Sequence, residues 1–445
     1  MRVVVVGGGA SGTLAALHLI GQASGAGRPL ELHLAEPGPL GRGVAYSTSN
    51  PQHRLNVPAA GMSALPGEPG HFVHWLRAHH DPAFPAGGFA PRAVFGTYLA
   101  GTLTRQRERA IGVRWIRHRT RALDLRRRGR GAAVTLAGGQ VLEADAVVLA
   151  LGHGPATSGW IPAGLRRSPR FVADPWRPGG LPPVPANSAV LLIGTGLTML
   201  DLAISYGHTR IHTVSRHGRL PLAHVAGPPP PAPVQLPDGP VTAASLRRLI
   251  FGRIRDLDGD WRTAVDGLRP ITQQAWSRLD AGDRRQVLAH AGRWERVRHR
   301  TAPELGAWLT ARHQQGQLTV QAAAVTGASD GGGSVLVGLS DGTRVHADLV
   351  VNCTGRGSIV DSRDDPLVSG LLARGSARPG PLGLGFATHP DGRLVSSDDL
   401  PAWTLGQLRR GELWESTAIP EIRDQAADIA GSILARVRAG TREVA

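Results

Sequence analysis

The chain contains no lysine, because all 50 basic residues among its 445 are arginines. Lysine forms Schiff bases with carbonyl substrates and with pyridoxal phosphate, and it is the phosphate-binding residue of the P-loop. Enzymes that depend on any of these three uses of lysine are therefore excluded.

Cysteine is nearly absent as well, since Cys353 is the only one. A single thiol forms no internal disulfide, no C-x-x-C redox pair and no thiolate zinc site. The clustered histidines His71, His74, His79 and His80 lack partnering acids in a recognisable ligand pattern. We therefore expect no bound metal.

Long apolar runs are also missing. No stretch approaches the roughly 20 residues that span a bilayer, and the opening run at 3–6 is too short for a signal peptide. We expect a cytoplasmic protein without a membrane span. The length allows two or three domains, and 59 glycines and 34 prolines indicate the many turns of an α/β fold.

Acidic residues are fewer than basic ones. The chain has 34 of them against 50 arginines, which gives a formal net charge of +16. Residues 105–130 alone hold eleven arginines. Aromatic side chains that would stack on bases are not interleaved there, apart from Trp115. We interpret this stretch as a solvated basic face and expect no nucleic-acid partner.

The first chemical signal is a glycine turn at the start of the chain. An apolar strand at 3–6 runs into Gly7-x-Gly9-x-x-Gly12 and then into an apolar helix. This order is the dinucleotide-binding fingerprint, in which glycines allow a tight turn and close approach of the backbone to a pyrophosphate at the helix N-terminus. The expected cofactor-binding residues of this turn are Gly7, Gly9, Ala10, Ser11 and Gly12.

The second strand, at 30–35, ends in Glu36, 24 residues after Gly12. A carboxylate in this position accepts hydrogen bonds from a ribose diol and repels a 2′-phosphate. The first site therefore predicts FAD or NAD and not NADP. The alternative is an ordinary strand-to-helix turn that binds nothing.

A second turn of the same kind occurs at 188–201, where a buried strand leads into Gly194 and Gly196. Met199 occupies the third glycine position, so this helix is expected to pack less closely on its strand. The next strand ends at 214 and is followed by Ser215 and Arg216. The expected cofactor-binding residues here are Gly194, Gly196, Leu197, Thr198, Ser215 and Arg216.

Arg216 lies 20 residues after Gly196, where a 2′-phosphate would be bound. Its planar guanidinium can pair with two phosphate oxygens at once. This chemistry selects NADPH over NADH. The alternative is that Arg216 is a surface residue in an arginine-rich chain.

Two further segments, 143–154 and 346–357, each combine a polar lead-in, a buried strand and a small-residue turn at Gly152 or Gly355. They look like the crossings between the domains of flavoproteins with two dinucleotide sites. Gly152 and Gly355 are therefore also expected at the cofactors. We predict an α/β fold with two Rossmann-like dinucleotide-binding domains: a discontinuous FAD domain at 1–155 and 346–445, and an inserted NADPH domain at 156–345.

The inserted domain itself contains an unusual stretch. Residues 227–237 are proline-rich and indicate a linker, and the pattern at 243–314 is helical and rich in Trp and Arg. We predict a small helical insertion at 227–314 that acts as a lid or a substrate cap.

Several segments together resemble the FAD/NAD(P)-binding proteins related to flavin-containing and N-hydroxylating monooxygenases. The resemblance covers nearly the whole chain and rests on GGGASG, GRGVAYSTSNPQHRLNVPA, PRAVFGTYL, VADPW, LIGTGLTMLD, VSRHGRLP, RHRTAP and LWESTAIPEIRDQA. It departs from class B monooxygenases in one respect, because FVADPW stands where their F-x-G-x-x-x-H-x-x-x-W fingerprint is expected.

The resemblance implies roles for two more segments. Asn56 matches an asparagine beside the flavin and the nicotinamide, and we expect its amide to be the catalytic donor, with Arg54 at the cofactor; a plain turn asparagine is the alternative. Ala418 and Ile419 match a helix start that faces the flavin, where N–H groups would stabilise negative charge on the reduced ring.

The activity implied is that of an FAD-dependent, NADPH-consuming monooxygenase. It would act through a flavin C4a-hydroperoxide and transfer oxygen from O2 to a small molecule, with N-oxygenation of an amine or amino acid as the first candidate. Two alternatives remain: an NAD(P)H-dependent flavin oxidoreductase that passes electrons to a quinone or protein acceptor, and a nucleotide-sensing flavin protein without turnover. The sequence leaves the substrate and the oligomeric state open.

Overall fold

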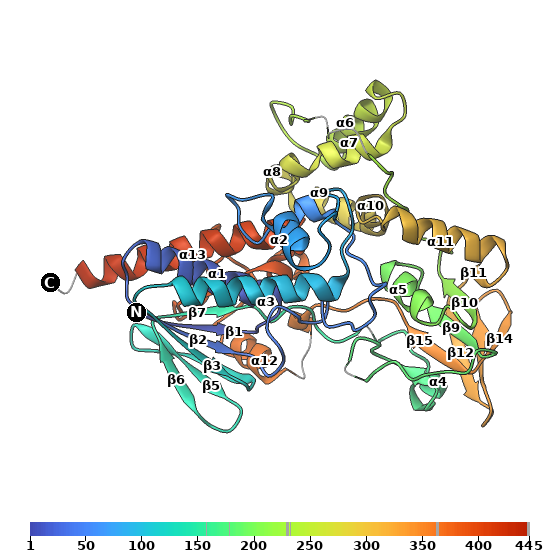
Figure 1. Cartoon of the computed structure of the whole chain (residues 1–445), viewed down its shortest axis with the longest axis horizontal. Helices are drawn as coiled ribbons and strands as arrows, with labels where there is room; N and C mark the ends of the chain where they lie inside the picture. The colour runs from blue at the N-terminus through green and yellow to red at the C-terminus, as the bar shows by residue number, and fades with distance from the viewer. Residues whose placement is uncertain (157, 178, 228–230, 232, 362–364, 443–445) are drawn as a thin grey trace.

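The computed structural model describes residues 1–156, 158–177, 179–227, 231, 233–361 and 365–442. Two parallel five-stranded sheets dominate these residues, and each is accompanied by an antiparallel three-stranded sheet (Figure 1). The predicted α/β class with two Rossmann-like units is confirmed.

The first sheet has the order β16-β7-β1-β2-β3, and all its strands are parallel. Its strands are β1 (Arg2–Val6), β2 (Leu30–Ala35), β3 (Val113–His118), β7 (Ala146–Leu149) and β16 (Ala402–Thr404). The C-terminal part of the chain thus supplies an edge strand to the sheet that the N-terminus starts.

The valines of β1 alternate between two cores, as the two-residue period of a strand dictates. Val3 and Val5 face the core under α1 (Ala10–Gly25), α3 (Arg92–Arg109) and α13 (Ile419–Arg442). Val4 and Val6 face a second core. That core is closed by β4 (Ala122–Arg128), β5 (Gly131–Leu136), β6 (Val141–Ala144) and α12 (Pro366–Ala373). Both faces of the sheet are therefore covered, which explains the continuous apolar run.

The second sheet repeats this plan in the order β11-β10-β9-β15-β8. Its strands are β8 (Phe171–Val172), β9 (Ala189–Ile193), β10 (Arg210–Ser215), β11 (Leu318–Ala322) and β15 (Leu349–Asn352). One face packs on α5 (Leu197–Ser205) and α11 (Pro303–Gln314), and the other packs on α4 (Ala163–Arg167) and on β12 (Val325–Asp330), β13 (Val335–Leu339) and β14 (Arg344–Ala347).

The predicted boundary at 346 is wrong. β14 pairs with β13, and β15 pairs with β9 in the second sheet, so the chain returns to the first unit only after Asn352. The two connecting segments then run side by side, since Gly154 N–H donates to the Gly357 carbonyl at 3.0 Å and Gly357 N–H donates to the Pro155 carbonyl at 2.9 Å. The crossings between the units are therefore adjacent.

The helical insertion begins near Ala243 and ends near Arg298. Its helices are α6 (Ala243–Asp256), α7 (Trp261–Gly267), η2 (Arg269–Ile271), α8 (Thr272–Arg278), α9 (Ala281–Ala289) and α10 (Ala291–Arg298). Side chains of Thr242, Asp260 and Asp280 cap α6, α7 and α9, which explains their starts. The expected end of the insertion at 314 is wrong, because α11 belongs to the core of the second unit. Residues 228–230 and 232 of the proline-rich stretch lie outside the described residues.

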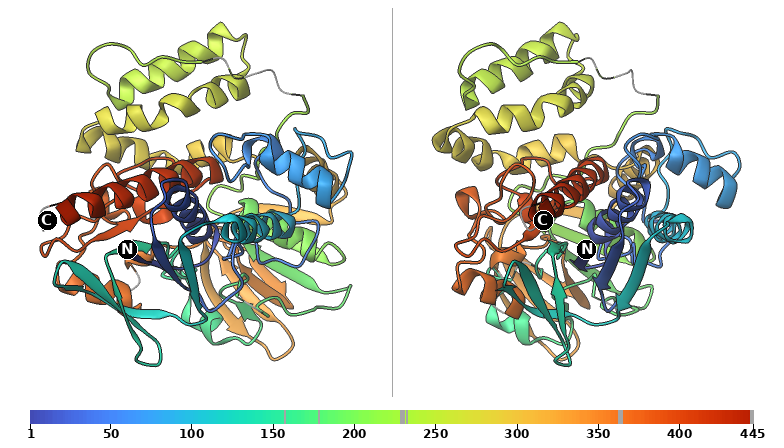
Figure 2. Two further views of the ribbon diagram at one scale, coloured as in Figure 1. Left: turned by 60° about the vertical axis from the view of Figure 1, so that its left-hand side comes forward. Right: turned by 90° about the vertical axis from the view of Figure 1, so that its left-hand side faces the viewer.

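The insertion lies on the C-terminal segment, above α13 in Figures 1 and 2. Arg269 pairs with Glu421 at 2.7 Å, and Arg298 pairs with Glu415 at 2.9 Å. The Trp276 indole donates to the Gly411 carbonyl at 2.8 Å. These contacts attach the insertion to the first unit although the chain inserts it into the second.

The remaining elements are short. They are α2 (His71–His79) and the 3-10 turns η1 (Ala59–Gly61), η3 (Ile359–Asp361), η4 (Pro381–Gly383) and η5 (Gly406–Arg409). Among the described residues, no helix is both long enough and apolar enough to cross a membrane.

Candidate functional site

The first glycine turn requires glycine at two positions for reasons of packing. Gly7 has φ = +99°, and a Cβ there would lie 2.3 Å from the Ala150 carbonyl oxygen. A Cβ on Gly12 would lie 1.8 Å from the carbonyl oxygen of Gly7. Both contacts are far below van der Waals distance, so these glycines let β1, β7 and α1 meet closely.

Gly9 is different, because the backbone does not demand glycine there. It is the N-cap of α1 with φ = −65°, and a Cβ would meet the Gly43 Cα at 3.3 Å. Ala10 and Ser11 follow in the first turn of the helix. The N-terminus of α1, with its partial positive charge, therefore begins at a residue whose added Cβ would be only slightly too close to Gly43.

Glu36 is held over this turn by two backbone donors. Its Oε2 accepts from the Gly8 N–H at 2.7 Å, and its Oε1 accepts from the Gly38 N–H at 2.7 Å. Each carboxylate oxygen has a second lone pair. The side chain is thus oriented and still able to accept hydrogen bonds from a ribose.

A third turn reaches this site from the C-terminal part of the chain, which sequence reasoning missed. Gly406 follows β16 with φ = +69°, and a Cβ there would lie 3.0 Å from the Ser11 hydroxyl. Its N–H donates to the Gln425 side chain at 3.0 Å. The next residue, Gln407, is buried, and its side-chain oxygen has no hydrogen-bond partner in the described part of the chain. The only sequence signal is the apolar strand AWT before a glycine.

The predicted helix start near Ala418 also lies in this region. α13 begins at Ile419, which is buried, and the Ala418 carbonyl accepts the Ile422 N–H at 3.0 Å. The Gln425 side chain donates to the Ser416 carbonyl at 3.3 Å. The same glutamine therefore connects the Gly406 turn to the start of α13.

The second turn opens into a cavity of about 1340 Å³. The cavity brings together every residue that the sequence assigned to the second site: Gly194, Gly196, Leu197, Thr198, Ser215, Arg216 and Gly355. Gly194 has φ = +113°, and a Cβ there would lie 2.6 Å from the Cys353 carbonyl oxygen, whereas a Cβ on Gly196 would meet open space. Gly196 is the N-cap of α5. The second turn thus copies the first.

Met199 at the third glycine position is completely buried in the core of this unit. On the cavity side, the Ser215 hydroxyl bonds to Thr195 at 2.8 Å and accepts the Gly218 N–H at 3.1 Å. Arg216 is exposed and has no hydrogen-bond or ion-pair partner among the described residues. Its guanidinium is therefore available to a ligand.

Asn56 contacts the segment between β10 and the helical insertion. Its backbone carbonyl accepts a hydrogen bond from Nε2 of His224 at 3.1 Å. Burial, and after it the positive charge of Arg300, lowers the pKa of His224 to about 4. The imidazole is thus neutral near pH 7 and donates to the Asn56 loop. Sequence reasoning missed His224, and no local pattern marks it.

Arg54 is placed by the interface between the two units. Its carbonyl accepts from Arg92 Nε at 3.0 Å, and Arg92 also pairs with Asp201 on α5 at 2.9 Å. Asp201 is buried, and burial raises the pKa of its carboxyl group against the opposing effect of Arg92. His53, also buried, bonds to the Ser205 hydroxyl of α5 at 2.9 Å.

Gly152 lies at the carboxyl end of β7 with φ = +71°, and a side chain there would meet open space. Nearby, Arg356 donates to the Gly154 carbonyl at 2.9 Å and pairs with Asp174 at 2.7 Å. The crossings are thus tied to each other and to the second unit.

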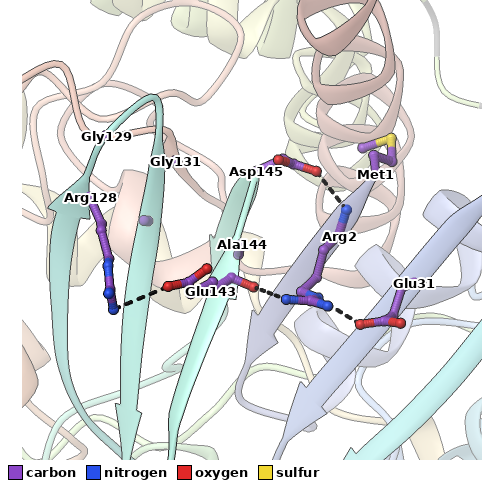
Figure 3. Close-up of a pocket in the computed structure, with 10 residues that line it drawn as sticks. Met1, Arg2, Glu31, Arg128, Gly129, Gly131, Glu143, Ala144 and Asp145 are labelled. Atoms are coloured by element: carbon purple, nitrogen blue, oxygen red, sulfur yellow. Dashed lines mark hydrogen bonds and ion pairs between the residues drawn. The ribbon is translucent and has the colours of Figure 1, made fainter.

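A second, polar pocket of about 570 Å³ lies between the amino ends of β1 and β2 and the antiparallel strands β4, β5 and β6 (Figure 3). Its charged groups are paired: Arg2 with Glu31 at 2.6 Å, and Arg128 with Glu143 at 3.1 Å. The Arg2 N–H also donates to Asp145 at 2.7 Å. It adjoins the amino ends of β1 and β2, away from the glycine turns, and ligands of parallel α/β sheets bind at the carboxyl ends. Within the described residues, no group of three or more His, Cys, Asp or Glu side chains could hold a metal ion.

Comparison with known proteins agrees with this geometry. Residues 4–154 match a protein family described as FAD-NAD(P)-binding. No curated protein matches the sequence significantly. An ornithine hydroxylase from Pseudomonas aeruginosa superposes with a TM-score of 0.65 at 17% identity, over 97% of this chain and 98% of that one. The chain has the fold of this hydroxylase.

Two further solved structures support the assignment of the fold. An L-lysine 6-monooxygenase from Pseudomonas syringae gives a TM-score of 0.65 at 16% identity, over 97% of this chain and 98% of that one. An ornithine N-hydroxylase from Kutzneria sp. 744 gives 0.63 at 17% identity, over 98% and 99%. The expected resemblance to N-hydroxylating monooxygenases is thus confirmed at the level of the fold.

Proposed function

We propose that the protein is an FAD- and NADPH-dependent monooxygenase that oxygenates the nitrogen of a small amine or amino acid. The observation that carries the proposal is the pair of glycine turns at the carboxyl ends of two parallel sheets, with adjacent crossings between the units. Two such sites allow one dinucleotide to reduce the other within one chain.

The first site fits FAD. Gly9, Ala10 and Ser11 would hold the pyrophosphate at the start of α1, and the carboxylate of Glu36 would accept from the ribose diol. The buried, unpaired oxygen of Gln407 calls for a donor, which a hydroxyl group of the cofactor would supply.

The second site fits NADPH. Gly196, Leu197 and Thr198 would hold the pyrophosphate at the start of α5, and Ser215 and Arg216 would hold the 2′-phosphate. The exposed, unpaired guanidinium of Arg216 supports NADPH over NADH.

When bound, the flavin would accept a hydride from NADPH and supply the oxygen chemistry. The protein would position the reactants and exclude water. The Asn56 amide would donate a hydrogen bond at the flavin, and neutral His224 would hold the Asn56 loop through its carbonyl. The insertion, anchored on Glu415 and Glu421, would limit access of solvent.

A nitrogen acceptor is supported by the substrates named for proteins of the same fold. One is an L-lysine 6-monooxygenase, and another is an ornithine N-hydroxylase whose structure contains reduced FAD, NADP⁺ and L-ornithine. The single, buried Cys353 leaves no dithiol for a disulfide reductase.

The test is NADPH oxidation by the purified protein across a panel of amines and amino acids, with O2, H2O2 and hydroxylamine products followed together. We expect one class of amine to raise NADPH consumption and to yield a hydroxylated nitrogen in proportion. Rapid reduction of quinones without any oxygenated product would reject oxygenation in favour of electron transfer. Bound flavin that NADPH does not reduce would reject both.

A further inference from the structure

The large cavity has a second wall that does not come from the dinucleotide-binding turns. Residues from the end of α9 to just past α10, all in the helical insertion, also line the cavity. In Figure 1, α10 lies above α5, whose N-terminus forms part of the first wall. The insertion therefore closes over the second turn as well as over the C-terminal segment.

The two walls carry the same charge. Arg216 and Arg219 line the first wall, and Arg293 and Arg296 line the second. Glu295 is the only acid among the described lining residues, and it pairs with Arg410 at 3.1 Å. In the described part of the chain, the guanidinium groups of Arg216, Arg219 and Arg293 have no hydrogen-bond or ion-pair partner. The excess of positive charge in the cavity thus favours an anionic ligand.

The position of α10 indicates which part of a dinucleotide this charge would meet. Arg296 Nε donates to the Leu220 carbonyl at 2.8 Å, which holds α10 against the loop that follows β10 and contains Arg216. Burial, and after it the positive charge of Arg219, lowers the pKa of Arg296. The positive charges of Arg296 and Arg219 repel each other unless an anion lies between or beside them.

We propose that Arg293 and Arg296 of the helical insertion bind the 2′-phosphate of NADPH together with Arg216 and Arg219, so that the insertion takes part in dinucleotide selection. The proposal rests on the NADPH site assigned above. A phosphate monoester carries about 1.5 to 2 negative charges near pH 7, enough to offset much of this cluster. The pyrophosphate already has the N-terminus of α5 as its binding element.

Arg293 is the position to test, because its side chain is exposed and without a protein partner, so we expect its removal to leave the fold intact. Binding of NADPH, NADH and 2′,5′-ADP to the purified flavoprotein would be measured by calorimetric titration. We expect Arg293→Ala to weaken NADPH and 2′,5′-ADP about tenfold and to leave NADH unchanged. Arg293→Lys should retain much of the affinity, since it keeps the charge.

Arg285 provides the matched control, as an exposed and unpaired arginine on α9 that is not among the residues lining the cavity. Arg285→Ala should bind all three ligands like the wild type. Unchanged NADPH binding by Arg293→Ala would overturn the inference while leaving the proposed function intact, and equal losses for NADPH and NADH would overturn the 2′-phosphate assignment. If the wild-type protein binds neither dinucleotide, the proposed function fails and this inference fails with it.

Discussion

A substitution at Gly9 can best distinguish a glycine that is needed for ligand binding from one that is needed for folding. Its φ of −65° suits any residue, and an added Cβ would meet only the Gly43 backbone, 3.3 Å from its Cα. With alanine at this position, the Gly43 backbone must move by a few tenths of an ångström. Alanine is also a poorer N-cap residue than glycine. We expect Gly9→Ala to lower the free energy of unfolding by about 1 kcal/mol.

The effect on the cofactor should be much larger. The new methyl group would occupy the space between the helix start and the pyrophosphate of FAD. Loss of two backbone hydrogen bonds to phosphate, at about 1.5 kcal/mol or more each, corresponds to more than about a hundredfold in affinity. The protein should therefore fold and purify without its yellow colour.

The assay is the ratio of flavin absorbance to protein after purification, with a thermal melt to check the fold. Gly25→Ala is the matched control on the same helix, because Gly25 is exposed and an added Cβ meets nothing within 4 Å. Gly12→Ala should instead damage the fold itself, given a Cβ 1.8 Å from a carbonyl oxygen. Stoichiometric FAD in folded Gly9→Ala would refute the assignment of this turn to the pyrophosphate.

Three other expectations concern the second site and the Asn56 loop. Arg216→Ala should weaken NADPH binding by about 1.5 to 3 kcal/mol, which raises its Kd tenfold or more, and should leave the Kd for NADH unchanged. Equal increases of both Kd values in a titration would show that Arg216 does not bind the 2′-phosphate. Asn56→Ala should keep FAD and divert NADPH electrons to H2O2, measured with a peroxide assay; unchanged coupling would contradict a donor role. His224, whose pKa falls from 6.5 to about 4 on folding, binds fewer protons in the folded state, so its contribution to stability is complete above pH 6.5 and is lost towards pH 4. His224→Gln should therefore lose less stability than the wild type between pH 7.5 and 5 in urea unfolding, and an identical loss would show that the native imidazole is not neutralised by its surroundings.

Local patterns in the sequence predicted the parts of this fold that local sterics decide. Gly7, Gly12 and Gly194 each sit where a Cβ would collide with backbone, so the glycine and the turn are inseparable. Buried apolar runs likewise identified the central strands of both parallel sheets, but not β3, β8, β11 and β16. The boundary at 346 was wrong because β15 has the same local pattern as β7, and only its pairing with β9 assigns it to the second unit.

The parts that sequence reasoning missed are contacts between distant segments. The bond from His224 to the Asn56 carbonyl joins residues 168 positions apart. Gly406 comes within reach of Ser11 only because β16 adds to the edge of the first sheet. Neither residue belongs to a motif, and no periodicity encodes its partner. Such contacts depend on the assembled topology.

The same long-range contacts explain how two separate units could act on one reaction. Asp201 lies on α5, one turn beyond the dinucleotide-binding residues of the second unit, and its buried carboxylate pairs with Arg92, which also donates to the Arg54 carbonyl two residues before Asn56. Removing one partner of a buried ion pair costs about 3 to 5 kcal/mol, because the other charge stays buried and unpaired. Displacement of α5 from this loop would break the pair, and the cost would be largest if Asp201 stayed buried. The Asp201–Arg92 pair therefore favours one relative position of the second turn and the Asn56 loop, and the proposed hydride transfer between two dinucleotides would need such a fixed alignment.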